Sequence, residues 1–251
     1  MTMMKCWLAA ALALTVAGCA PRSDDREDPA RGEASASRTG DRAAATVVTP
    51  AAASEATVAA VSARPRIAIL GDSLTAGLGL PKAAAYPSLL QQRVDADGLG
   101  FEIVNAGVSG DTSAGGLARL DWALDGDVRI LLVALGGNDG LRGLPAEELR
   151  SNLAQIIERA QMRGITVILA GMDAPPNYGR DYIVSFHAVY PALAAKYHVA
   201  IVPFLLQGVA GHENLNQRDG IHPTAAGARI VADTVWAVLG PIAESRRRPP
   251  T

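Results

Sequence analysis

Between residues 66 and 239, short runs of apolar residues alternate with longer segments in which apolar positions recur at helical spacing. Short apolar runs are typical of strands buried on both faces, and the longer segments are typical of amphipathic helices. Strands are predicted at residues 66–70, 102–105, 129–135, 166–170 and 200–202. Helices are predicted at residues 84–96, 113–124, 146–163, 181–197 and 225–239. The alternation predicts an α/β fold, a three-layer αβα sandwich around a roughly five-stranded parallel sheet.

Segments rich in glycine and polar residues follow the first four predicted strands. They are Gly-Asp-Ser at 71–73, Gly-Val-Ser-Gly-Asp at 107–111, Gly-Gly-Asn-Asp at 136–139 and Met-Asp-Ala-Pro-Pro-Asn at 172–177. In open α/β sheets, ligands bind outside the carboxyl ends of the strands, near the point where the strand order reverses. We therefore expect these loops to hold the chemistry of the protein.

The N-terminal region has the composition of a targeting segment. Lys5 gives it a positive start, and residues 7–17 form an apolar run too short to span a bilayer. The run ends in Val-Ala-Gly-Cys at residues 16–19, which resembles the lipobox of bacterial lipoproteins, where cleavage before the cysteine leaves it lipidated. We predict a signal peptide at residues 1–18 and lipidation of Cys19. The alternatives are an ordinary signal peptide cut nearby and a chance cysteine in an alanine-rich run.

Residues 19–64 contain almost no large apolar side chain, so they cannot bury enough surface to offset the entropy lost on ordering. They are predicted to be a disordered tether that spans about 40 Å or more. The folded domain is predicted at residues 65–240 and a C-terminal tail at 241–251. These features place the protein in the bacterial cell envelope, lipid-anchored on the periplasmic side. Ala20 follows the cysteine, in place of the Asp that resembles an inner-membrane retention signal, and this favours the outer membrane.

Charge and cysteine content exclude several functions. The formal net charge is −2, and no basic cluster indicates a nucleic-acid partner. The only two cysteines, Cys6 and Cys19, lie in the first twenty residues. The predicted domain therefore has no cysteine nucleophile, thiolate zinc site or internal disulfide.

Ser73 is a candidate nucleophile because it directly follows the first predicted strand. Read alone, Gly-Asp-Ser favours a helix cap, and the nucleophile interpretation requires a base within hydrogen-bond reach. His222 stands three residues after Asp219 in Asp-Gly-Ile-His-Pro, just before the last predicted helix. A carboxylate so close can fix the tautomer of the imidazole, although a loop histidine with a capping aspartate has the same pattern. The other three histidines lie in packing or surface contexts.

Asn138 follows the most apolar predicted strand of the chain, in the segment Gly-Gly-Asn-Asp at residues 136–139. Its amide either caps the next turn or donates to a developing oxyanion beside the nucleophile.

Together these segments resemble the blocks of the SGNH, or GDSL, hydrolase family, in type, order and position at strand ends. Ser73 lies in a GDSL block, Asn138 in a GxND block, and Asp219 with His222 in a DxxH block. The resemblance implies the flavodoxin-like SGNH hydrolase fold and a Ser73–His222–Asp219 triad. It implies no metal and no organic cofactor.

The segment Asn-Ala-Gly-Val-Ser-Gly-Asp-Thr-Ser at 105–113 looks most like the bacterial thioesterase, lysophospholipase and arylesterase branch of this family. In that branch the glycine before Asp-Thr supplies a backbone N–H to the oxyanion hole. Gly107 and Gly110 are both available, and we choose Gly110. The resemblance thus implies an oxyanion hole formed by the N–H groups of Ser73 and Gly110 and the amide of Asn138.

Two other readings fail on particular residues. An α/β-hydrolase elbow requires G-x-S-x-G, but Thr75 occupies the last position. The glycine patterns of nucleotide-binding loops are absent after the first strand.

The expected function is a serine ester hydrolase that forms an acyl-enzyme on a small acyl ester or thioester, such as an aryl ester or a lysophospholipid. Six residues of the strand-end loops are predicted either to line an acyl groove or merely to close the end of the sheet: Leu78, Leu80, Leu141, Leu144, Pro175 and Tyr178. The main alternative is a carbohydrate O-acetylesterase of the cell envelope, with a more polar pocket. A non-catalytic envelope lipoprotein on a hydrolase scaffold is the alternative of another class.

Overall fold

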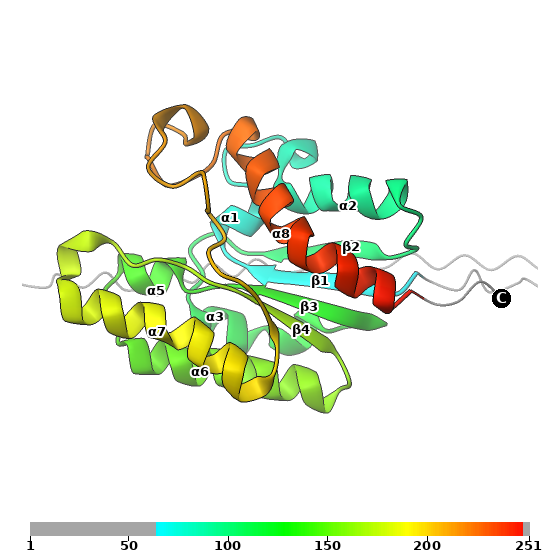
Figure 1. Ribbon diagram of the computed structural model, residues 1–251, viewed down its shortest axis with the longest axis horizontal. Coiled ribbons are helices and arrows are strands. Elements are labelled where there is room, and N and C mark those ends of the chain that lie inside the picture. The colour runs from blue at the N-terminus through cyan, green and yellow to red at the C-terminus, as the bar shows by residue number, and fades with distance from the viewer. Residues whose placement is uncertain (1–63, 248–251) are drawn as a thin grey trace, which may run out of the picture. The chain divides into compact units, whose positions relative to one another are not determined.

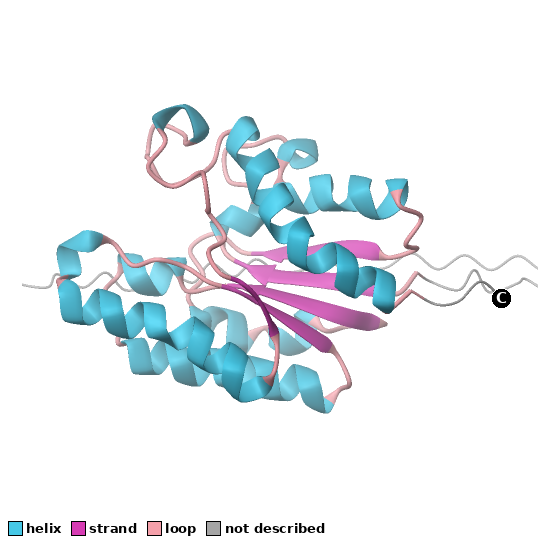
Figure 2. Ribbon diagram, viewed as in Figure 1, coloured by secondary structure: helices cyan, strands magenta, loops and turns pink. Residues whose placement is uncertain are grey.

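The computed structural model describes residues 64–247, which form a five-stranded parallel sheet covered by helices on both faces (Figures 1 and 2). The strands are β1 Arg66–Gly71, β2 Glu102–Gly107, β3 Val128–Ala134, β4 Thr166–Ala170 and β5 Ala200–Val202. The predicted signal peptide, the lipobox with Cys19 and the predicted tether up to residue 63 lie outside the described residues.

The strand order is β2-β1-β3-β4-β5, so the order reverses between β1 and β3. In the register, Leu70 of β1 lies opposite Ala106 of β2 on one side and Val133 of β3 on the other. The loops that follow β1 and β3 therefore start side by side at the carboxyl edge of the sheet. This is the position at which a doubly wound sheet binds its ligands.

The helices form one layer on each face of the sheet (Figure 1). Helices α2 Tyr86–Ala96 and α8 Ala225–Ser245 cover one face, whereas α3 Ser113–Ala118, α6 Ala146–Met162 and α7 Arg180–Tyr197 cover the other. The shorter elements are α1 Ser73–Ala76, α4 Leu120–Ala123 and α5 Gly137–Leu141, with single turns at Lys82–Ala84, Pro176–Tyr178 and Glu213–Leu215. The predicted three-layer α/β architecture is confirmed.

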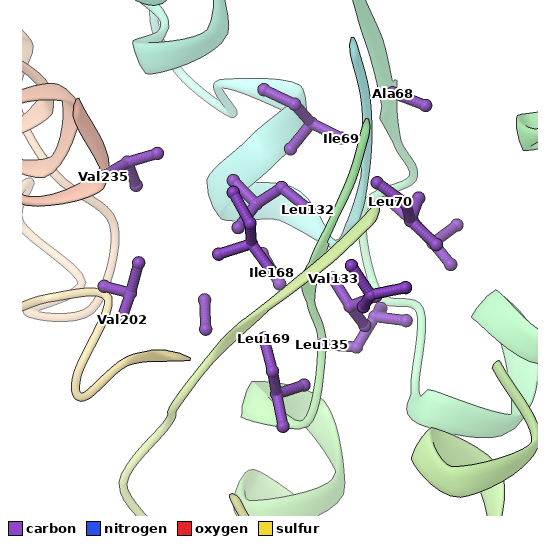
Figure 3. Packing of buried hydrophobic residues seen from close by; sticks show 14 of the residues in the cluster. Ala68, Ile69, Leu70, Leu132, Val133, Leu135, Ile168, Leu169, Val202 and Val235 are labelled. Carbon is purple, nitrogen blue, oxygen red and sulfur yellow. The ribbon is translucent and has the colours of Figure 1, made fainter. Parts of the chain in front are cut away.

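The core is built on the two central strands, whose continuous apolar runs are buried on both faces. Ile69 lies in register with Leu132, and Leu132 with Ile168, so their side chains project to the same face of the sheet. Figure 3 shows these three on the side of Val235 of α8, and Leu70 on the opposite side. All five side chains are fully buried. Burying an aliphatic side chain of this size contributes about 1.5–3 kcal/mol, so the central strands anchor the loops that follow them.

Helix α8 is, among the described residues, the one helix long and apolar enough to cross a membrane. Its Val231, Val235 and Leu239 are buried in the domain core, which identifies it as a core helix.

Two predicted domain boundaries are wrong. The predicted end at residue 240 is too early, because α8 continues to Ser245 and buries Ala243 completely. Pro241 removes one N–H from the helix, but the apolar residues after it still reach the core. Arg64, assigned to the tether, belongs to the domain, since its guanidinium donates to the carbonyl of Phe101 and pairs with Asp95 at 2.7 Å.

The predicted helix at 113–124 is interrupted at Arg119, which ends α3 and precedes α4. Its backbone leaves the helical conformation at φ −107° and ψ 14°.

Candidate active site

Ser73 is the first residue of α1 and lies immediately beyond the carboxyl end of β1. Asp72 caps this helix, since its Oδ1 accepts the N–H of Leu74 at 3.0 Å. Glycine is required at position 71, because a Cβ there would lie 2.0 Å from Thr75 Oγ1. The chain can therefore turn tightly from strand to helix, and this turn presents the Ser73 hydroxyl at the edge of the sheet.

A line of hydrogen bonds joins Ser73 to the pair predicted as its base. His222 Nε2 lies 2.8 Å from Ser73 Oγ, and His222 Nδ1 lies 2.7 Å from Asp219 Oδ2. With the Nδ1 proton donated to the carboxylate, Nε2 is free to accept the hydroxyl proton. The structure thus brings together all three residues predicted as a triad.

Asp219 also shapes its own loop. Its Oδ1 accepts the backbone N–H groups of Ile221 and His222, each at 3.0 Å. These bonds, led by the N–H of His222 and supplemented by the imidazole, lower the pKa of Asp219 from 3.8 to about 2. The carboxylate is therefore ionised at neutral pH and can stabilise an imidazolium beside it.

The loop that carries this pair is fixed to its surroundings by Gln217. The backbone N–H of Gln217 donates to the carbonyl of His222 at 2.7 Å, and its side chain donates to the carbonyls of Leu78 and Pro223. Because Leu78 follows α1, this contact ties the loop of the base to the segment of the nucleophile.

Asn138 and Gly110 face the same cavity as Ser73 and His222. The Asn138 amide nitrogen donates to the carbonyl of Asp111 at 2.9 Å and lies 3.3 Å from Asp72 Oδ2. Gly110 occupies a turn with φ +85°, which favours glycine. Within residues 64–247, its backbone N–H donates to no other group.

Gly107, the other candidate glycine, is used structurally. Its N–H donates to Asn105 Oδ1 at 2.9 Å, and a Cβ at this position would lie 2.3 Å from the backbone nitrogen of Ala76. Gly107 therefore lets α1 pack closely against β2, and its N–H does not face the cavity.

Asp72 is a buried carboxyl that sequence reasoning did not single out. Its side chain is only 2% exposed, and burial raises its pKa from 3.8 to about 6, against the lowering effect of the hydrogen bond from Leu74. In the sequence, only its position between Gly71 and Ser73 could have indicated a role in the site.

A cavity of about 510 Å³ opens beside the Ser73 hydroxyl, with mostly apolar walls. Of the six residues predicted to line a groove, Leu78, Leu141 and Pro175 contribute to it. Further apolar walls were missed: Met172, Phe204, Leu206 and Ile221. Phe204 and Leu206 could have been found from the sequence, because they belong to the apolar run directly after the predicted strand at 200–202.

The other three predicted groove residues lie elsewhere. Leu80 borders a smaller hollow that Ser73 and His222 also line. Tyr178 donates its hydroxyl to the carbonyl of Leu141 at 2.8 Å, and its ring covers Gly143. Leu144 accepts the hydroxyl of Tyr182 at 2.8 Å through its carbonyl. Tyr178 and Leu144 are not among the residues that line this cavity, and both take part in contacts that brace the loop after β3.

No cluster of three or more His, Cys, Asp or Glu residues that could hold a metal ion occurs within residues 64–247.

Comparison with known proteins gives a consistent result. A model of the GDSL-like Lipase/Acylhydrolase family matches residues 69–230. Esterase TesA of Pseudomonas aeruginosa is 43% identical over 182 residues, which cover 72% of this chain and 90% of that protein. Thioesterase 1/protease 1/lysophospholipase L1 of Escherichia coli is 38% identical over 182 residues, with 72% and 86% covered. A crystal structure of TesA superimposes with a TM-score of 0.68 at 44% identity, covering 70% of this chain and 99% of that one.

Proposed function

The chain belongs to the GDSL-like lipase/acylhydrolase family and is a serine esterase of the SGNH type, and we propose that it cleaves acyl esters or thioesters through an acyl-enzyme on Ser73. The observation that carries this mechanism is the pair of hydrogen bonds from Ser73 Oγ to His222, at 2.8 Å, and from His222 to Asp219, at 2.7 Å. Distances of this size allow proton transfer without rearrangement.

In the first step, the Ser73 hydroxyl proton passes to His222 Nε2 as Oγ bonds to the carbonyl carbon of the substrate. The imidazolium then gives this proton to the departing oxygen or sulfur, and the bond from the carbonyl carbon to the leaving group breaks. In the second step, His222 takes a proton from water as that water attacks the acyl-enzyme. Collapse of the second intermediate returns the proton to Ser73 and releases the acid.

The negative charge that develops on the carbonyl oxygen requires donors fixed beforehand. The N–H groups of Ser73 and Gly110 and the amide of Asn138 are proposed to supply them. One Asn138 N–H is held by the carbonyl of Asp111 at 2.9 Å, whereas the contact with Asp72 is long, at 3.3 Å. The N–H in the long contact is only weakly engaged, since hydrogen bonds weaken as they lengthen, and we propose that this N–H is shared with the oxyanion.

The cavity favours an apolar acyl chain over a sugar. Its volume of about 510 Å³ lies in the usual range for small-molecule sites, and its walls are mainly apolar side chains. We propose that Leu78, Leu141 and Pro175, with Phe204 and Leu206, surround the chain. The printed names of the relatives, esterase and thioesterase/lysophospholipase, support a substrate of this class.

The test is a comparison of substrates with the full chain. Turnover of nitrophenyl acetate, butyrate and octanoate is measured beside release of acetate from acetylated xylan, with Ser73→Ala as the control. We expect kcat/KM to rise with chain length, weak activity on the glycan, and covalent labelling of the wild type alone by a fluorophosphonate. Preference for the glycan would establish a carbohydrate O-acetylesterase. Absence of labelling together with absence of turnover would favour a non-catalytic protein.

We also propose that Cys19 anchors the protein to the outer membrane on its periplasmic side. The support is the sequence Val-Ala-Gly-Cys at residues 16–19 after a short apolar run. Cys19→Ser is expected to move the protein from the membrane fraction to the soluble fraction. Cys6→Ser is the matched control, because it changes the other of the two cysteines, which lies within the predicted signal peptide, and should leave the distribution unchanged. Membrane association that survives Cys19→Ser would contradict lipidation.

A further inference from the structure

Arg119 makes an unusual set of contacts beneath the carboxyl ends of β1 and β2. It lies between α3 and α4, and its side chain is only 18% exposed. Its Nε donates to Asp111 Oδ2 at 2.5 Å, its Nη1 to the carbonyl of Ala106 at 2.7 Å, and its Nη2 to the carbonyl of Gly71 at 2.8 Å. One guanidinium thus binds three separate acceptors at the edge of the sheet where the site lies.

The three acceptors belong to the two segments that carry the backbone donors of the proposed oxyanion hole. Gly71 stands two residues before Ser73, and Asp111 directly follows Gly110. The guanidinium is planar and its N–H directions are fixed, so it holds its acceptors at defined separations. Arg119 therefore sets the position of the segment of Gly110 against the segment of Ser73.

We infer that Arg119 is the positioning residue of the oxyanion hole, fixing the spacing between the N–H groups of Ser73 and Gly110. This inference rests on the proposed acyl-enzyme function. Arg119 is not among the residues that line the cavity, so it acts through the backbone and does not touch the substrate.

A second arginine contacts the same turn from outside. Arg142 Nη2 donates to the carbonyl of Gly110 at 2.8 Å, but this side chain is exposed and makes one such bond. An exposed contact is screened by water and contributes little. Arg119 is mostly buried and ionically paired, so of the two arginines it contributes more to the spacing, beside the backbone bond from the N–H of Val108 to the carbonyl of Gly71 at 3.0 Å.

Loss of Arg119 is expected to affect the transition state more than substrate binding. Its removal takes one donor from the mostly buried Asp111 carboxylate and one from the carbonyl of Ala106, and it leaves the carbonyl of Gly71 with the N–H of Val108. The turn at Gly110 is then held less firmly. A misplacement of about 1 Å can reduce a catalysed rate by about 10². The apolar walls of the cavity stay in place, so KM should change little.

The experiment measures kcat and KM for nitrophenyl butyrate with Arg119→Met, Arg119→Lys and a matched control, Arg129→Met. Arg129 is an exposed arginine on β3 that pairs with Asp127 near the opposite end of the strand. We expect Arg119→Met to lower kcat by about 10² with KM within about twofold of wild type. The kcat of Arg119→Lys should lie between those of Arg119→Met and wild type, because an ammonium keeps the positive charge but lacks the planar arrangement of N–H donors. Arg129→Met should behave as wild type.

A trifluoromethyl ketone adds a readout that a purely structural role would not move, because it forms a tetrahedral oxyanion on Ser73. Its inhibition constant should rise by the same factor as kcat falls, while the melting temperature of Arg119→Lys stays within a few degrees of wild type.

If kcat and the inhibition constant of the ketone are both unchanged in Arg119→Lys and in folded Arg119→Met, the inference is wrong. A lower melting temperature with unchanged kcat likewise makes Arg119 a structural residue only. If Arg119→Met fails to fold, the lysine variant alone decides between these outcomes. Absence of turnover and fluorophosphonate labelling in the wild type would instead refute the proposed function.

Discussion

Asp72→Asn is expected to stabilise the domain at neutral pH and to destabilise it slightly in acid. The carboxyl is almost completely buried, and burial raises its pKa from 3.8 to about 6. An acid whose pKa is higher in the folded state binds its proton more tightly when folded. Its favourable contribution to stability is therefore complete below about pH 4 and is lost as the pH rises through about 6.

The size of the effect follows from the pKa difference. A rise from 3.8 to about 6, at about 1.4 kcal/mol for each pH unit, corresponds to about 3 kcal/mol lost by the wild type at neutral pH. An asparagine does not ionise and so avoids this loss. Its carbonyl oxygen can still accept the N–H of Leu74, but its NH2 group conflicts with the amide of Asn138. The conflict subtracts a constant of about 1 kcal/mol at every pH.

The assay is urea unfolding of wild type, Asp72→Asn and Asp97→Asn between about pH 4 and pH 8. Asp97 is an exposed carboxylate at the end of α2 and serves as the control. The free energy of unfolding of Asp72→Asn, relative to wild type, should increase across the range from about pH 4 to pH 6 and then level off. A difference that stays flat, falls with pH, or is matched by Asp97→Asn would refute the reasoning.

The remaining predictions concern the reacting residues. Ser73→Ala should abolish turnover without changing the melting temperature; hydrolysis within a few-fold of wild type would remove it from the mechanism. Asn138→Ala should lower kcat by about 10²–10³ in steady-state assays, and a change confined to KM would make it a ground-state binding residue. His222→Ala should cost as much as Ser73→Ala and the double variant little more, whereas losses that multiply would show that the two residues act independently. Asp219→Asn should keep its far-UV circular dichroism spectrum but greatly lower kcat, because the imidazole loses its orientation; a nearly silent change would exclude this role.

The sheet was predictable because each strand is a short apolar run with a clear boundary. Residues 166–170 and 200–202 coincide with β4 and β5. The break in the predicted helix at 113–124 was not predictable, because Arg119 meets acceptors on β1 and β2 that the local sequence does not reveal. Tertiary contacts of this kind override local helical preference.

For the site, the residues with a chemical motif were found and those defined by burial were not. Ser73, Asp219 and His222 were candidates from their types and spacing, and their resemblance to the GDSL and DxxH blocks joined them as a triad. The raised pKa of Asp72 depends on how deeply α1 packs, which no local pattern expresses. Phe204 was missed because the apolar run after β5 does not itself show that it lines the cavity, and this placement is set by the tertiary fold.

The reacting groups come from opposite ends of the folded chain. His222 lies 149 residues after Ser73, between β5 and the final helix α8. Contacts over such a separation carry a large loop-closure entropy and form slowly compared with local ones. Ester cleavage therefore begins only after the segment before α8 has settled against α1 and the residues that follow it. Until that segment is in place, the site has its nucleophile but no base. Recovery of hydrolysis during refolding therefore reports the docking of this segment beside Ser73.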